Sequence, residues 1–131
     1  MNELVLWLFL ITLPVVAIGL HELTHLAAAR LYTTVRIGGI SLRPFTLTLQ
    51  FTGREPPTHV LRVVALAPLL VGMSTGGLLY STGIWRLLYA IEPYYLSYLI
   101  VLNWLLYSHL SPTDLRLAIK PDTAARSATG H

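Results

Sequence analysis

The chain has 131 residues, of which 54% are hydrophobic and 11% are charged, and its formal net charge is +3. Soluble domains carry about 25% charged residues, so this few charges could not cover a water-facing surface. The absence of cysteine excludes disulfides, Cys-ligated zinc and thiol nucleophiles. No Lys/Arg-dense run or glycine-rich phosphate loop indicates nucleic-acid or nucleotide binding. The composition therefore predicts a membrane protein whose surroundings are the lipid bilayer.

Three long apolar segments follow one another along the chain. They run from Leu4 to about Leu31, from about Val60 to Tyr80, and from about Leu87 to Tyr107. A helix that crosses a bilayer needs about 20 residues, and each segment is long enough. Met-Asn-Glu rather than a positive region precedes the first segment, which favours a retained transmembrane helix over a signal peptide. The second segment holds several small residues that would allow close helix approach: Gly72, Ser74, Thr75, Gly76 and Gly77.

The stretch between the first and second segments has a different pattern. From Phe45 to Phe51 apolar residues alternate with polar ones, and Val35 and Ile37 begin a similar alternation upstream. This period of two predicts β-strands, and Gly38-Gly39 is a turn signal between strand pieces. We therefore expect a mainly α membrane protein with about three transmembrane helices and a short β-hairpin or small sheet between helices one and two.

The basic residues predict how the chain crosses the membrane. The region between segments one and two and the region after segment three hold most of them: Arg30, Arg36, Arg43, Arg54, Arg62, Arg116, Lys120 and Arg126. The loop between segments two and three has only Arg86. Because basic residues are enriched in cytoplasmic loops, the N-terminus is expected outside and the C-terminus in the cytoplasm. We predict one membrane-embedded core over residues 1–120 and a disordered tail over residues 121–131.

The motif His21-Glu22-Leu23-Thr24-His25 stands near the cytoplasmic end of the first apolar segment. Two histidines at positions i and i+4 share one helical face, so both imidazoles can reach one metal ion. Glu22 can point toward a bound water without being a ligand. Zinc lowers the pKa of such a water to about 7, and a carboxylate then takes its proton as it attacks a carbonyl. Ionisable groups inside an apolar helix are costly, which favours a functional role.

A catalytic zinc site needs a third protein ligand, and four residues are candidates. Asp114 and His109 follow the third apolar segment and are expected at the same membrane level as the HExxH motif. His59 precedes the second segment on the same side, in a loop of unknown position. Glu92 is expected at the opposite face of the membrane. Asp114 is the first choice and His109 the second.

These features resemble the site-two protease family of intramembrane zinc metalloproteases. The HExxH on the first core helix, the β-region after it and the aspartate after the third helix carry the resemblance, together with Ala67-Pro68-Leu69. Asp114 stands in Ser111-Pro112-Thr113-Asp114 rather than in the family's Leu-Asp-Gly, a form more similar to small prokaryotic zincin-type membrane peptidases. The resemblance implies His21, His25 and Asp114 as zinc ligands and a multi-pass protein of a prokaryotic cell membrane. It also implies that Asn103 binds substrate or the oxyanion.

The expected function is hydrolysis of peptide bonds in transmembrane or membrane-proximal protein substrates, with Glu22 as the general base. The resemblance further implies that the β-region could bind an unwound substrate as an added strand. Two other functions fit the same residues. One is a catalytically silent membrane regulator, and the other is a metal- or haem-binding membrane protein that uses His21, His25 and His109.

Overall fold

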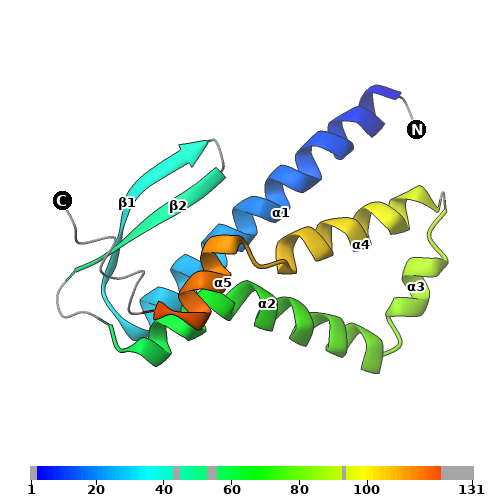
Figure 1. Ribbon diagram of the computed structural model, residues 1–131. Helices are drawn as coiled ribbons and strands as arrows, with labels where there is room; N and C mark the ends of the chain where they lie inside the picture. Colours follow the sequence, from blue (N-terminus) through cyan, green and yellow to red (C-terminus); the bar gives the residue numbers. More distant parts are fainter. Residues whose placement is uncertain (1–2, 43–44, 53–55, 93, 122–131) are drawn as a thin grey trace. The chain divides into compact units, whose positions relative to one another are not determined.

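The computed structural model describes residues 3–42, 45–52, 56–92 and 94–121, and most of them are helical (Figure 1). The elements in chain order are α1 (Glu3–Tyr32), β1 (Val35–Leu42), β2 (Phe45–Phe51), α2 (Thr58–Ser81), α3 (Trp85–Tyr89), α4 (Tyr95–Ser108) and α5 (Pro112–Ile119). The expected mainly α fold with a small antiparallel sheet between the first two long helices is confirmed. Of the expected tail, residues 122–131 lie outside the described residues, and Pro121 is buried.

Two helices have the length and hydropathy to cross a membrane. At about 1.5 Å per residue, the 30 residues of α1 and the 24 of α2 exceed the hydrocarbon thickness of about 30 Å. The third apolar segment is divided between α3 and the 14-residue α4. That division coincides with the Glu92-Pro93 sequence, because proline disfavours the helical conformation of the residue before it. The third helix is therefore shorter than expected.

The two strands form a hairpin whose turn is not where the sequence suggested. Leu42 at the end of β1 pairs with Phe45 at the start of β2, and Gly38-Gly39 lies inside β1. Ile37 pairs with Leu49 and Gly39 with Thr48, which leaves Gly38 as the extra residue of a β-bulge. A Cβ atom at Gly38 would lie 2.5 Å from Cγ of Gln50. The two glycines thus lie at a local irregularity of β1 and do not form a turn.

The backbone contacts divide the chain into two compact units. The first comprises Met1–His21 and Leu69–His109, and the second comprises Glu22–Pro68 and Leu110–His131. The long helices α1 and α2 each contribute to both units. The hairpin and α5 belong to the second unit, and α3 and α4 belong to the first.

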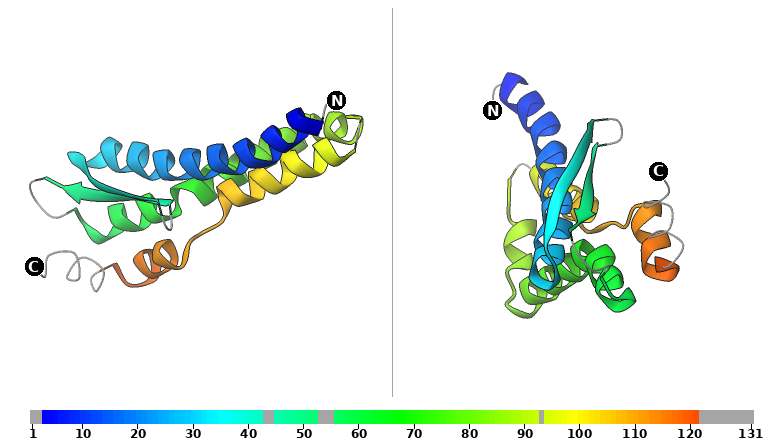
Figure 2. Two further views of the ribbon diagram at one scale, coloured as in Figure 1. Left: turned by 90° about the horizontal axis from the view of Figure 1, so that it is seen from above. Right: turned by 90° about the vertical axis from the view of Figure 1, so that its left-hand side faces the viewer.

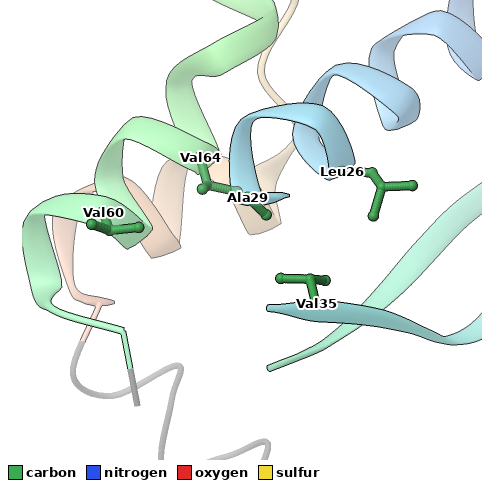
Figure 3. Close-up of a cluster of buried hydrophobic side chains, with 5 residues drawn as sticks. All are labelled: Leu26, Ala29, Val35, Val60 and Val64. Carbon is green, nitrogen blue, oxygen red and sulfur yellow. The ribbon is translucent and has the colours of Figure 1, made fainter. Parts of the chain in front are cut away.

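A small apolar core holds the second unit together. Its buried members come from the end of α1, the start of β1 and the first turns of α2, and they are Leu26, Ala29, Val35, Val60 and Val64 (Figure 3). Leu49 and Phe51 of β2 pack against this cluster. The hairpin accordingly continues from the C-terminal end of α1, as both views of Figure 2 show. This core fixes the last turns of α1 against the start of α2.

The first unit contains a close contact between α2 and α4. The indole N–H of Trp104 donates to the carbonyl of Gly72 at 3.1 Å, and the indole N–H of Trp85 donates to the carbonyl of Gly76 at the same distance. A Cβ atom at Gly76 would lie 2.6 Å from the Trp104 ring, and one at Gly72 would collide with Ser108. Close helix approach at small residues of the second segment is therefore confirmed at Gly72 and Gly76, whereas a Cβ atom at Gly77 would meet nothing within 4 Å.

Candidate metal centre

The HExxH residues lie on one uninterrupted stretch of α1. His21 and His25 are one helical turn apart and are 4% and 8% exposed, while Glu22 is half-buried. Their neighbours Leu20 and Leu23 point outward and are 51% and 53% exposed. The helix therefore turns its two imidazoles inward and its leucines outward, as the i, i+4 spacing predicts.

His25 is held by the backbone of α2. Its Nδ1 lies 2.7 Å from the carbonyl oxygen of Val64, in a buried position. Because a carbonyl oxygen can only accept, Nδ1 carries the proton and donates it, and in the neutral ring Nε2 then holds the lone pair. This Nε2 lies 3.3 Å from Oδ1 of Asp114. With the His25 ring neutral, two electron-rich atoms face each other, an arrangement that a cation between them stabilises.

Asp114 owes its orientation to the start of α5. Ser111 is the N-cap of this helix, and Pro112 occupies the first helical turn. The Ser111 backbone N–H donates to Asp114 Oδ2 at 2.9 Å, and the Asp114 backbone N–H donates to the Ser111 hydroxyl oxygen at 3.1 Å. In this capping box one carboxylate oxygen is fixed by Ser111, and the other, Oδ1, is directed at His25. The Asp114 side chain is 13% exposed.

His21 is held in the same way as His25, by a backbone carbonyl. Its Nδ1 lies 2.7 Å from the carbonyl oxygen of Tyr107, in the last turn of α4. Nδ1 is therefore the donor here as well, and in the neutral ring Nε2 is the nitrogen with the lone pair. Metal-binding histidines almost always donate their second ring N–H to a carbonyl or carboxylate, which fixes the tautomer. Both histidines meet that condition.

The donor atoms of the three residues can hold a metal ion. One ligand atom from each of His21, His25 and Asp114 lies within 4.8 Å of the other two. Two ligands that are each about 2.1 Å from a tetrahedral zinc ion lie about 3.4 Å apart. The 3.3 Å between His25 Nε2 and Asp114 Oδ1 agrees with that spacing. Two imidazole nitrogens and one carboxylate oxygen also form a donor set that zinc accepts.

The other three candidates for the third ligand lie outside this group. Among the residues that the structure describes, His21, His25 and Asp114 are the group able to hold a metal ion. His59 is exposed in the first turn of α2, and Glu92 is exposed between α3 and α4. His109 is exposed and its Nδ1 lies 2.7 Å from the Leu106 carbonyl oxygen, although its ring centroid is 5.6 Å from that of His21.

Asn103 lies in the middle of α4. Its side-chain amide nitrogen donates to the Leu99 carbonyl one turn earlier, at 2.8 Å. Its Oδ1 is buried and has no hydrogen-bond partner among the described residues. The amide nitrogen of Asn103 is thus bonded within its own helix. A substrate or oxyanion role for Asn103 stays a prediction.

Three groups of the site were missed in the sequence. The carbonyls of Val64 and Tyr107 are backbone atoms, and no motif of side chains marks them. The third is the Ser111 backbone N–H, which the Ser-Pro-Thr-Asp stretch could have revealed because Ser-x-x-Asp is a helix-capping pattern. Comparisons of this chain with protein-family models, curated proteins and solved structures found no match.

Proposed function

We propose that this protein is a zinc metalloprotease of the membrane that hydrolyses peptide bonds in transmembrane or membrane-proximal proteins. The observation that supports it best is the pair His25 and Asp114, whose donor atoms lie 3.3 Å apart while a backbone carbonyl and a capping box hold the two side chains. His21, one turn earlier in α1, supplies the third donor. With three protein ligands, a fourth position is available for water or substrate, as in catalytic rather than structural zinc sites.

The proton transfers of the proposed reaction are assigned to Glu22. Zinc, when bound, supplies the Lewis acidity that makes water nucleophilic at neutral pH. Glu22 is the general base: it takes a proton from the water while the water oxygen bonds to the peptide carbonyl carbon. Glu22 then passes this proton to the leaving amine nitrogen as the carbon–nitrogen bond breaks. Glu22 is half-buried and directly follows His21 in α1, so it lies near the histidines without sharing their helical face.

The apolar surface supports a membrane location for this reaction. Both α1 and α2 have the length and hydropathy to cross a bilayer, and large apolar side chains such as Leu8, Ile11 and Met73 are more than 60% exposed. We propose a multi-pass arrangement with the N-terminus outside and the hairpin in the cytoplasm. A third crossing would use the region of α3 and α4, whose 14-residue α4 spans only about 21 Å.

The test is to separate zinc binding from cleavage. Purified wild type in detergent should contain one zinc ion per chain and cleave at least one member of a membrane-substrate panel. Glu22→Gln should keep the zinc and lose about 100-fold or more of the cleavage rate, because the amide cannot take a proton. Glu3→Gln, in the exposed first turn of α1, is the matched control and should leave both unchanged.

Each other outcome contradicts the proposal in a distinct way. Cleavage that survives in Glu22→Gln would remove Glu22 from the base role. A zinc-loaded wild type that cleaves nothing, in membranes as well as in detergent, would favour a silent regulator. A Soret absorption band of the purified protein would favour haem binding, since zinc gives no such band.

A further inference from the structure

The carbonyl that holds His25 lies inside a helix, where such a group is normally already bonded. In an α-helix, the carbonyl of residue i accepts from the N–H of residue i+4. For Val64 that donor would be residue 68, which is Pro68 and has no N–H. The Val64 carbonyl therefore lacks its helical donor, and the Nδ1–H of His25 occupies its place at 2.7 Å.

Burial makes this exchange of donors energetically important. Val64 is 3% exposed, and Pro68 is the largest fully buried side chain of the described residues. Water is excluded from such a position, and an unpaired carbonyl in an apolar environment is destabilising. Proline is tolerated inside membrane helices where a neighbour satisfies the carbonyl that it releases. Here that neighbour is a histidine of the candidate metal centre.

We propose that Pro68 is a positioning residue for His25. Because Pro68 has no amide hydrogen, the Val64 carbonyl is available to the imidazole. In the neutral ring, the bond to that carbonyl keeps the proton on Nδ1 and leaves the lone pair on Nε2, on the side of Asp114. The Val64 carbonyl thus sets both the tautomer and the ring orientation of His25. This inference rests on the proposed metal site, and it extends that site into the middle of α2.

The first variant is Pro68→Ala, which restores an N–H at position 68 in a residue that favours helix. The new N–H competes with His25 for the Val64 carbonyl. Zinc affinity, measured by competition with a chromophoric chelator, should fall roughly 10- to 100-fold, as it does when groups that orient a metal ligand are lost. The matched control is Pro14→Ala, which removes the proline inside α1 and should leave zinc affinity unchanged.

A second variant separates the missing hydrogen from the proline ring. The α-hydroxy acid lactate at position 68 gives an ester that has alanine's side chain but no N–H. It should restore zinc affinity to within a few-fold of wild type. The nitrogen chemical shifts of the His25 ring, measured on metal-free protein, should show a protonated Nδ1 in wild type and in the ester. In Pro68→Ala they should show a mixture of tautomers.

The outcomes distinguish this inference from the proposed function. Equal zinc affinity and equal His25 tautomers in wild type and Pro68→Ala would overturn the positioning role and leave the metal site standing. An ester variant as weak as Pro68→Ala would show that the ring, not the missing hydrogen, matters, and would also overturn it. Wild type that binds no zinc would overturn the proposed function, while the tautomer measurement would still test how Pro68 acts on His25.

Discussion

His25 makes its two polar contacts through the two nitrogens of one ring. Nδ1 donates to Val64 of α2, and Nε2 faces Asp114 of α5. Removing the carboxylate would leave the proposed metal ion with two protein ligands. Loss of a group that only orients a metal ligand lowers metal affinity by up to about 100-fold. Because Asp114 is itself a proposed ligand, Asp114→Ala should lower zinc affinity by on the order of 100-fold or more.

A chelator titration of the Asp114→Ala variant measures this loss. His59→Ala, which removes an exposed histidine in the first turn of α2, is the control and should bind zinc as wild type does. If Asp114→Ala kept its zinc and His109→Ala lost it, the third ligand would be His109.

Ser111 acts on the site through Asp114. Its hydroxyl accepts the Asp114 backbone N–H, and its own N–H fixes Asp114 Oδ2. Ser111→Ala removes the hydroxyl cap, which is worth about 0.5–2 kcal/mol to a helix start. We expect roughly 10-fold weaker zinc binding in this variant, while Ser111→Thr, which can still cap, should stay near wild type.

The neighbouring Thr113→Ala is the control for position, since Thr113 is exposed on the same turn. Zinc affinity and helix content should both be measured, the latter by circular dichroism. Equal zinc affinity in Ser111→Ala and wild type would mean that the backbone bond to Oδ2 orients Asp114 without help from the hydroxyl.

At the scale of elements, the contact between α2 and α4 depends on the absence of side chains at particular positions. A Cβ atom at Gly76 would lie 2.6 Å from Trp104, whereas one at the adjacent Gly77 would meet nothing within 4 Å. Gly76→Ala should lower the free energy of unfolding by about 1–3 kcal/mol, because the added methyl group overpacks the contact with Trp104. Gly77→Ala should raise it by up to about 1 kcal/mol because alanine favours helix.

Thermal unfolding in one detergent, with both variants side by side, measures this difference. The two substitutions change the same chemical group at neighbouring positions, so helix propensity cancels between them. Equal melting temperatures would show that α2 and α4 do not meet at Gly76.

At the scale of the whole molecule, a metal ion would join elements that are distant in sequence. The second unit has a core of few buried apolar side chains, drawn from α1, β1 and α2. A ligand that binds only the folded state stabilises it by about 4 kcal/mol at a free concentration 1,000 times its dissociation constant. Zinc removal by a chelator should therefore lower the melting temperature of wild type.

The same chelator should have little effect on Asp114→Ala, which is the control for unspecific action on the protein or the detergent. Restoring zinc should restore the melting temperature of wild type. An unchanged melting temperature in wild type that demonstrably loses its zinc would show that the ion contributes to chemistry and not to the fold.

Local patterns were enough to predict the parts of this protein that depend on neighbouring residues. The spacing of His21 and His25 places both on one helical face whatever the rest of the chain does. The alternation before Phe51 predicted β2, and the long apolar segments predicted α1 and α2. Such features follow from helix and strand periodicity, which the order of residues carries directly.

Only the tertiary structure decided which distant groups meet these local elements. Asp114 rather than His109 or His59 joins the histidines in the group able to hold a metal, and backbone carbonyls hold both imidazoles. Gly38 is the extra residue of a bulge rather than part of a turn, because β1 pairs with β2 on both sides of it, through Ile37 and Gly39. The physical reason is that contacts across long sequence separations depend on how whole elements pack, and no local periodicity encodes that packing.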